Sequence, residues 1–310
     1  MKGVVIKSTG SHYLVRNENG DICNAKARGN IRLQGRKTTN PIAVGDKVEL
    51  VYGDESVWMI SSIEPRDNYL IRRSVNLSRQ EHIIASNLDV VFVVATISYP
   101  RTSTGFIDRV LCTAEAYKIK PVLVFNKIDL YDEDDTAYLE ALIQLYESIG
   151  YTSLKVSATK GIGLEELKKE MKGRTCLFTG HSGVGKSSLL NAIDSNMDLR
   201  VGKISQAHQK GTHTTTFAEM FELSFGGYIV DTPGIKEFGV IDLNKAEVSH
   251  YFPEMFVRLA ECKFNDCMHI NEPGCAVRKA ISEHQISQSR YNSYLGIFNS
   301  EDLLEDWEKD

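Results

Sequence analysis

The chain has 310 residues, enough for two or three domains, and its 42% hydrophobic and 25% charged residues are typical of a folded globular protein rather than a disordered one. No apolar run approaches the roughly 20 residues needed to cross a bilayer, so we expect neither a membrane span nor a membrane partner. The net charge of -5 disfavours indiscriminate binding to nucleic acid, and we expect no DNA partner.

The N-terminus and the cysteines indicate the cellular compartment. Residues 1–6 lack the apolar core of a signal peptide. Three of the six cysteines stand isolated, as in a reducing compartment: Cys23, Cys112 and Cys176. We therefore expect a cytoplasmic protein, and we expect it to be a monomer.

Residues 1–66 alternate short β-prone runs with turn residues. The predicted strands are 3–8, 13–16, 22–27, 47–51 and 56–63. Five short strands favour a small closed barrel of the OB type, although the pattern alone also fits an SH3-like barrel. Five basic residues and no acidic one lie in residues 26–37, which indicates either an RNA-binding loop or a solvated basic loop.

Residues 67–86 form a polar connection, which we interpret as a linker, and residues 87–240 then alternate strands with helices. The predicted strands are 89–97, 122–125, 154–156, 176–179, 220–223 and 228–230. The predicted helices are 106–117, 134–149, 164–171 and 186–193. This order predicts a doubly wound α/β sheet.

A guanine-reading motif, Asn126-Lys127-Ile128-Asp129, follows the predicted strand 122–125. The Asp129 carboxylate can accept from the N1–H and the 2-amino group of guanine together, and adenine has neither donor. Asn126 should reach the base edge, while the stem of Lys127 should lie along the base. Ser157-Ala158-Thr159 resembles a third base-contacting loop, in which the N–H groups of Ser157 and Ala158 would face guanine O6.

A phosphate-binding loop lies between the predicted strand 176–179 and the predicted helix 186–193. Its glycines let the backbone wrap around phosphate oxygens, Lys186 should reach the β- and γ-phosphates, and Ser187 should bind Mg²⁺. The expected nucleotide contacts here are Gly180, His181, Ser182, Gly183, Val184, Gly185, Lys186, Ser187 and Ser188. In most GTPases this loop precedes the guanine motif, so the reversed order predicts a circularly permuted GTP-binding domain.

Two later segments are expected to sense the γ-phosphate. In Asp231-Thr232-Pro233-Gly234, Asp231 should hold Mg²⁺ through water and the Gly234 N–H should contact the γ-phosphate. Residues 211–216 must contain the second Mg²⁺-binding group. We predict Thr215, with the neighbouring threonines as open alternatives: Thr214 and Thr216.

The water-orienting Gln that many GTPases place after the Asp-x-x-Gly motif is missing, because Ile235 follows Gly234. We predict that His213, in the phosphate-sensing loop, places the attacking water. The alternative is that His213 is an exposed loop residue.

Residues 241–310, expected to be mostly helical with an acidic tail, contain a cluster of metal-binding residues: Cys262, Cys267, His269 and Cys275. Three thiolates and one imidazole complete a tetrahedral shell, which is typical of structural Zn²⁺ rather than of a catalytic zinc with an open position. The segment directly follows the Asp231–Gly234 motif, so we expect movement of that motif on loss of the γ-phosphate to pass along the chain into the zinc domain.

The reversed motif order, combined with the Cys/His spacing, resembles the RsgA (YjeQ/YloQ) family of circularly permuted small ribosomal subunit biogenesis GTPases. The resemblance covers nearly the whole chain and implies an OB barrel at 1–66, a permuted GTPase domain at 87–240 and a zinc domain at 241–310. It also implies GTP hydrolysis to GDP, binding to the rRNA of the small ribosomal subunit, and stimulation by that subunit. His181 stands where family members often have Gln, and Thr212 where they often have Arg.

Two other functions fit parts of the pattern. A nucleotide-gated binding module would use GTP to fix its shape, and turnover measured with and without small subunits separates it from the enzyme. A P-loop kinase of a small metabolite would share the phosphate loop, but the guanine motif and the switch motifs argue against it.

Overall fold

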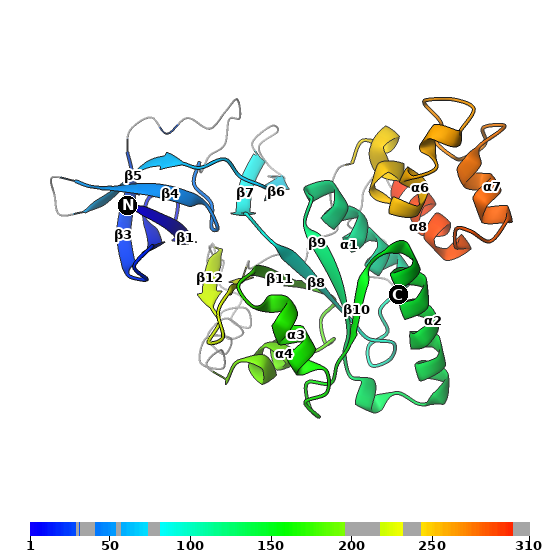
Figure 1. Ribbon diagram of the computed structural model, residues 1–310, viewed down its shortest axis with the longest axis horizontal. Coiled ribbons are helices and arrows are strands. Elements are labelled where there is room, and N and C mark those ends of the chain that lie inside the picture. The colour runs from blue at the N-terminus through cyan, green and yellow to red at the C-terminus, as the bar shows by residue number, and fades with distance from the viewer. Residues whose placement is uncertain are drawn as a thin grey trace. The chain divides into compact units, whose positions relative to one another are not determined.

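The structure, a computed structural model, describes residues 1–28, 31, 41–53, 57–73, 81–195, 218–231 and 243–299. The chain divides into two compact units. The first comprises residues 1–91, 167–178 and 193–235, and the second comprises residues 92–166, 179–192 and 236–310. Figure 1 shows both, with most of their elements labelled. Among the described helices, none is long and apolar enough to cross a membrane.

The first unit begins with a five-stranded barrel. Its strands are β1 (Lys2–Ser8), β2 (Tyr13–Asn17), β3 (Ile22–Ala27), β4 (Lys47–Tyr52) and β5 (Trp58–Ile63). They follow the order β1-β2-β3-β5-β4, and β4 pairs back with β1 to close the barrel. Alternate residues along β2, β3 and β4 point inward, so the buried core includes Val15, Ala25 and Leu50. The OB-type barrel is thereby confirmed.

A β-hairpin occupies the segment that the sequence suggested was a linker. Strands β6 (Tyr69–Arg73) and β7 (Glu81–Ser86) pair antiparallel in a sheet of their own. The hairpin forms because Leu70, Ile83 and Ala85 are apolar and buried. Their alternation is hidden in a polar, arginine-rich stretch, so these two strands were not predicted from the sequence.

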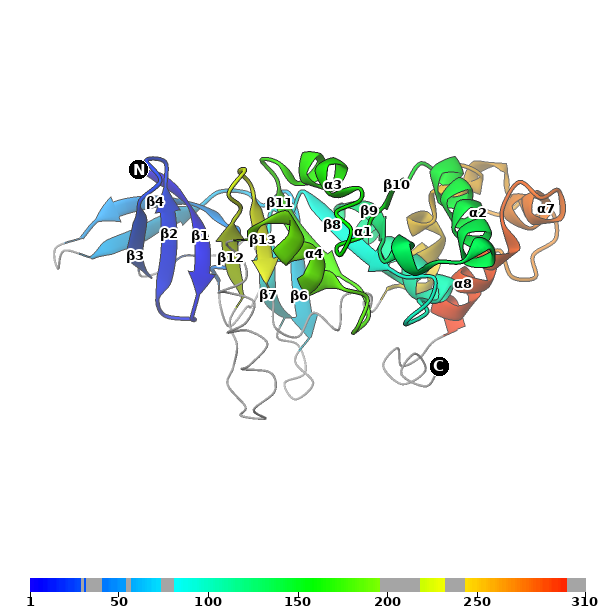
Figure 2. The same ribbon diagram turned by 90° about the horizontal axis from the view of Figure 1, so that it is seen from below.

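The first unit also contains most of α3 (Leu164–Met171) and of β11 (Thr175–Thr179), because residues 167–178 belong to it. Strands β12 (Glu219–Glu222) and β13 (Tyr228–Asp231) complete it. Strand β13 pairs parallel with β11 and antiparallel with β12. Figure 2 shows β12 beside β1 of the barrel, where Lys7 pairs with Glu219. An ion pair of 2.9 Å joins the side chains of these two residues.

The second unit contains β8 (Val90–Ala95) from Phe92 on, β9 (Lys120–Phe125) and β10 (Thr152–Lys155), in the order β10-β9-β8. Its helices in this region are α1 (Thr104–Tyr117), α2 (Glu133–Ile149) and α4 (Lys186–Ile193). Strand β8 is buried along its whole length, as its continuous apolar run predicted. Ser103 begins α1 by accepting the Phe106 N–H, and Asp132 begins α2 in the same way.

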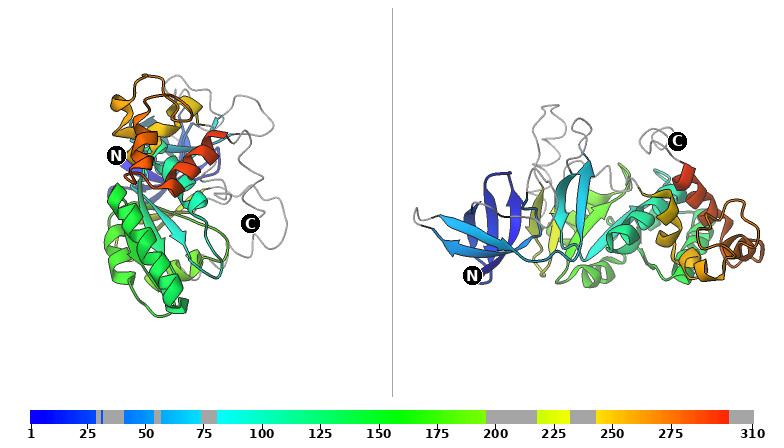
Figure 3. Two further views of the ribbon diagram at one scale, coloured as in Figure 1. Left: turned by 90° about the vertical axis from the view of Figure 1, so that its right-hand side faces the viewer. Right: turned by 90° about the horizontal axis from the view of Figure 1, so that it is seen from above.

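The C-terminal part of the second unit consists of short helical segments. They are η4 (Lys245–Tyr251), α6 (Pro253–Phe256), η5 (Leu259–Glu261), α7 (Ala276–Ser282) and α8 (Gln288–Asn299). Figure 3 shows them gathered beside α1. One buried cluster joins Cys112 of α1 to Phe252, Val277 and Tyr294, so this segment shares its core with α1.

Candidate nucleotide and metal sites

Asn126 joins the guanine motif to the phosphate loop. It follows β9, is 1% exposed, and its Nδ2 donates to the backbone oxygen of Val184 at 2.8 Å. Its Oδ1 accepts from the Ala158 N–H at 3.3 Å. One buried amide therefore holds all three predicted loops of the nucleotide site together.

Two hydroxyl groups hold the Asp129 carboxylate. Ser157 Oγ donates to Oδ1 at 2.5 Å, and Thr159 Oγ1 donates to Oδ2 at 3.1 Å. These hydrogen bonds, that of Ser157 above all, lower the pKa of Asp129, which keeps the carboxylate ionised and able to accept from guanine. Thr159 belongs to the predicted Ser157-Ala158-Thr159 loop, but the hydrogen bond from its hydroxyl was not predicted. Its position two residues after Ser157 is a signal that could have identified it.

The glycines of the phosphate loop have conformations and contacts that exclude side chains. Gly180, Gly183 and Gly185 have φ angles of 143°, 85° and 93°. A Cβ at Gly180 would overlap the backbone oxygen of Val94, and one at Gly185 would overlap Asn126 Nδ2. Gly185 thus allows the phosphate loop to approach the guanine motif closely.

Lys186 lies at the first position of α4, and its ammonium is held by the loop. Nζ donates to the backbone oxygens of Gly180 at 2.5 Å and His181 at 2.7 Å. Burial lowers the pKa of Lys186. The ammonium therefore already lies within the loop that wraps the phosphates in this motif.

His181 stacks on α1. Its ring centroid lies 3.9 Å from that of Phe106, with an interplanar angle of 35°. Burial, followed by the charge of Lys186, lowers the pKa of His181, so the imidazole is neutral near pH 7. The remaining loop residues Ser182, Ser187 and Ser188 are exposed, while Val184 is buried.

The other predicted residues of the site lie in the first unit or outside the described residues. Asp231 is the last residue of β13, in the first unit. Gly234, Thr214, Thr215, Thr216 and His213 lie outside the described residues. Most of the basic stretch at residues 26–37 also lies outside them.

Two family models match the chain. The model of the RsgA GTPase matches residues 63–241, and that of the RsgA N-terminal domain matches residues 2–57. The chain belongs to the RsgA GTPase family. It is thus a GTP-hydrolysing enzyme of this family, as the resemblance implied.

Relatives and solved structures extend the match over nearly the full length. A small ribosomal subunit biogenesis GTPase RsgA from Phocaeicola vulgatus is 55% identical over 302 residues, with 97% of each chain covered. One from Bacteroides fragilis strain YCH46 is 53% identical, with the same coverage.

The crystal structure of YjeQ from Thermotoga maritima aligns with a TM-score of 0.77 and 37% identity, covering 96% of each chain. That of YloQ, a circularly permuted GTPase, gives 0.75 and 28%, covering 96% of this chain and 93% of that one. These matches confirm the permuted fold that the motif order predicted.

The predicted metal ligands of this RsgA-family chain lie together. The ligand atoms of Cys262, Cys267, His269 and Cys275 are all within 4.8 Å of one another. His269 Nδ1 lies 3.4 Å from Cys275 Sγ and 3.7 Å from Cys262 Sγ. Burial lowers the pKa of His269, which favours the neutral imidazole that can bind a metal. Both the spacing and the donor set fit a tetrahedral metal ion.

Residues outside the cluster shape its loop. The Glu272 carboxylate accepts from the backbone N–H groups of Met268 and Ile270, both at 2.8 Å. The hydroxyls of Tyr291 and Tyr294, on α8, donate to the backbone oxygens of His269 and Met268, both at 2.6 Å. The two tyrosine contacts could not be predicted from the sequence, because their partners are backbone atoms more than 20 residues away.

A buried charge cluster ties α8 to α1. The Arg290 guanidinium donates to Asp108 at 2.7 Å and to Glu254 of α6 at 2.7 and 3.2 Å. Tyr146 of α2 also donates to Asp108, at 2.9 Å. Burial raises the pKa of Asp108, and the charge of Arg290 opposes that shift. This cluster fixes the C-terminal segment on α1 and α2.

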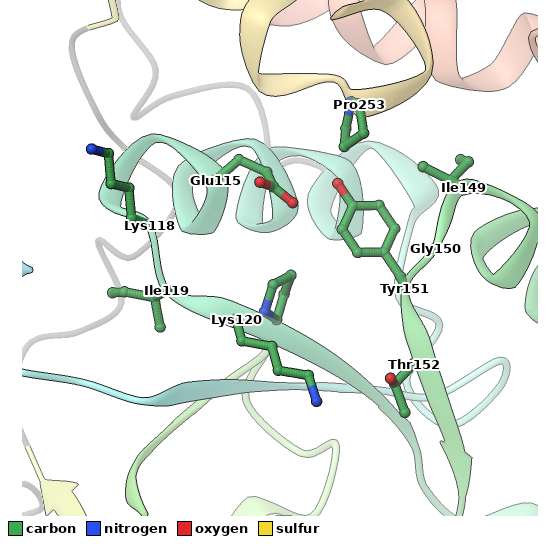
Figure 4. A pocket seen from close by; sticks show the side chains of 10 residues that line it. Glu115, Lys118, Ile119, Lys120, Ile149, Gly150, Tyr151, Thr152 and Pro253 are labelled. Carbon is green, nitrogen blue, oxygen red and sulfur yellow. The ribbon is translucent and has the colours of Figure 1, made fainter. Parts of the chain in front are cut away.

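A pocket of about 300 Å³ lies elsewhere in the second unit. It is formed around the start of β9 at Lys120 and the start of β10 at Thr152, with Pro253 on another side. Figure 4 shows Glu115 and Tyr151 pointing toward one another beneath α1. The nucleotide motifs follow the opposite ends of these strands, and none of the predicted site residues lines the pocket.

Proposed function

We propose that this GTPase hydrolyses GTP to GDP and phosphate during late maturation of the small ribosomal subunit, where it binds rRNA and is stimulated by the subunit. The name that the similar bacterial proteins carry, small ribosomal subunit biogenesis GTPase, supports the partner. The observation that supports the nucleotide is the buried Asn126 amide, which ties the guanine motif to the phosphate loop.

In this proposal each loop has one task. Asp129, oriented by Ser157 and Thr159, accepts from guanine. The Ala158 N–H, which donates to Asn126 Oδ1 at 3.3 Å, would turn to guanine O6, whereas the Ser157 N–H donates to the backbone oxygen of Ile162 at 3.0 Å. The N–H groups of residues 180–188 surround the phosphates, and Lys186 turns its ammonium from the carbonyls of Gly180 and His181 to the β- and γ-phosphates.

Mg²⁺ would be held by Ser187, Thr215 and Asp231, and it would neutralise charge developing on the phosphate oxygens. The exposed hydroxyl of Ser187, at the N-terminal end of α4, is free to be presented to a bound ion. The Gly234 N–H is assigned to the γ-phosphate, and the neighbouring switch carries the change on hydrolysis toward the zinc domain.

His213 is proposed to place the attacking water, because the sequence has Ile235 where many GTPases have a Gln. The His213→Ala variant is then expected to lose most of the turnover that small subunits stimulate while it keeps its affinity for GTP. Unchanged stimulated turnover in this variant would eliminate His213 from the mechanism.

The Cys262–Cys275 cluster is proposed to hold one structural Zn²⁺, because three thiolates and one imidazole form a closed shell. The barrel and this metal-bound segment would both contact rRNA of the small subunit. The protein is proposed to act as a monomer in the cytoplasm.

The test of the proposal is GTP turnover measured with and without purified small ribosomal subunits, with large subunits as the control. We expect stimulation by small subunits alone. Equal turnover in all three conditions would refute the ribosomal assignment. It would leave a nucleotide-gated binding module as the better description.

A further inference from the structure

The segment after β8, residues 97–102, forms a closed loop beside the proposed nucleotide site. Thr96 closes it, since its N–H donates to Thr102 Oγ1 at 3.1 Å and its backbone oxygen accepts from the Thr102 N–H at 2.9 Å. The Thr96 hydroxyl also donates to the backbone oxygen of Pro100. We call residues 97–102 the brace loop.

The Tyr131 hydroxyl connects the brace loop to the guanine motif. It accepts from the Ile97 N–H at 2.8 Å and donates to the backbone oxygen of Asn126 at 2.6 Å. Burial raises the pKa of Tyr131 to about 12, so the hydroxyl keeps the proton that it donates. A single oxygen atom therefore links the residues that follow β8 and β9.

Other bonds hold the brace loop against the motif and the phosphate loop. Lys127 Nζ donates to the backbone oxygen of Tyr99 at 2.5 Å, and Ser98 Oγ donates to Asp135 of α2 at 2.8 Å. On the other side, a Cβ at Gly183 would lie only 3.4 Å from Pro100 Cδ. The brace loop thus binds the base-reading segment and lies next to the phosphate-binding loop.

We propose that Tyr131 is a positioning residue for guanine recognition. It fixes the backbone of Asn126, three residues before Asp129, while the brace loop fixes the direction of the Lys127 stem. Two hydrogen bonds through one hydroxyl are lost together when that oxygen is removed, and the Ile97 N–H is then left without its partner. This proposal rests on the proposed GTP site.

A role in base recognition differs from a role in stability in which ligands are affected. If Tyr131 only supported the fold, its loss would lower the affinity for all nucleotides by the same factor. If Tyr131 positions Asn126 and Asp129, its loss lowers the affinity for GDP most. The affinity for IDP falls less, because IDP lacks the 2-amino group from which Asp129 would accept a hydrogen bond.

The experiment compares Tyr131→Phe with the unchanged chain, with GDP, IDP and ADP as ligands in calorimetric titrations. We expect GDP affinity to fall about five- to tenfold and IDP affinity by about twofold or less, since an unpaired buried group costs roughly a hydrogen bond. Tyr138→Phe on α2 is the matched control, because Tyr138 is partly exposed and its ring is kept. Its ratio of GDP to IDP affinity should stay unchanged.

If the ratio of GDP to IDP affinity in Tyr131→Phe equals that of the unchanged chain, the proposal is overturned, whether or not the affinities fall. Thr102→Val, which removes the acceptor for the Thr96 N–H, should lower the ratio in the same direction and serves if Tyr131→Phe does not fold. If the unchanged chain fails to prefer GDP over ADP, the GTP site itself is wrong. If the unchanged chain prefers GDP over ADP but the variants keep its ratio of GDP to IDP affinity, the GTP site stands and only the proposed role of Tyr131 is wrong.

Discussion

Arg290 Nη1 lies 2.7 Å from Asp108 Oδ1, and the side chains of both residues are only 1% exposed. The guanidinium also lies 4.6 Å from the ring centroid of Phe252, and it pairs with Glu254. A buried charge of this kind is tolerated only because its partners neutralise it and supply hydrogen bonds. The packing of the C-terminal segment on α1 therefore depends on a correctly paired cation.

The first prediction concerns this pair. Arg290→Met removes the cation and leaves Asp108 and Glu254 facing an apolar side chain. We expect the free energy of unfolding to fall by about 3–5 kcal/mol in chemical denaturation. Arg278→Met, on the exposed face of α7, should change it by less than about 0.5 kcal/mol. Equal stabilities of the two variants would contradict this account of the cluster.

The second prediction concerns Gly185, which combines a φ of 93° with close contact to Asn126. Gly185→Ala should weaken GDP binding by more than about tenfold, because the new Cβ displaces the Asn126 amide. Gly20→Ala is the control, since Gly20 has a φ of 88° in the barrel and no atoms near a new Cβ. Both variants carry the strain of a left-handed alanine, roughly 1–2 kcal/mol, but only Gly185→Ala should lose nucleotide affinity in fluorescence titrations.

The third prediction concerns the metal. Cys267→Ser should reduce bound zinc, measured by elemental analysis, from about one ion per chain toward zero, and should lower the melting temperature. Cys23→Ala removes another thiol, inside the barrel, and should leave the zinc content unchanged. A full complement of zinc in Cys267→Ser would show that this thiol is not a ligand.

The fourth prediction concerns pH. Burial and Lys186 lower the pKa of His181 in the folded state, so between pH 7 and 5 the unfolded chain binds more protons at this residue. The contribution of His181 to stability is then present above its unfolded pKa of about 6.5 and is lost as the pH falls through the folded value. His181→Gln, which does not titrate, should lose less stability than the unchanged chain over this range. Parallel pH profiles in urea denaturation would count against the lowered pKa.

The nucleotide motifs could be predicted because their residues are adjacent in sequence and follow apolar runs that form strands. Asn126, Asp129 and Gly185 were all identified in this way, and so was the metal cluster. The hydroxyl contacts of Thr159 and Tyr131 were missed because they depend on how separate loops close on one another. Arg290 was missed for a related reason: a single arginine in a helical segment reads as a surface residue until the helix is packed.

The secondary structure followed the same division. The barrel strands alternate buried and more exposed residues clearly enough to be predicted directly, as in β3. In the hairpin β6–β7 the apolar residues Leu70 and Ile83 lie on strands that are separated in the sequence by residues 74–80, and only pairing between the strands shows that they share one face.

Helix α1 is buried at seven successive or nearly successive positions, from Ile107 to Ala114, rather than along one stripe. A helix buried all round needs cover on every side, and here part of that cover comes from the C-terminal residues that pack around Cys112. The C-terminal segment is therefore part of the packing of α1 and does not form a separate domain that could be exchanged independently. A chain cut before residue 243 would expose the side of α1 that packs on the C-terminal segment around Cys112, so truncations and domain exchanges should keep α1 and this segment from the same parent.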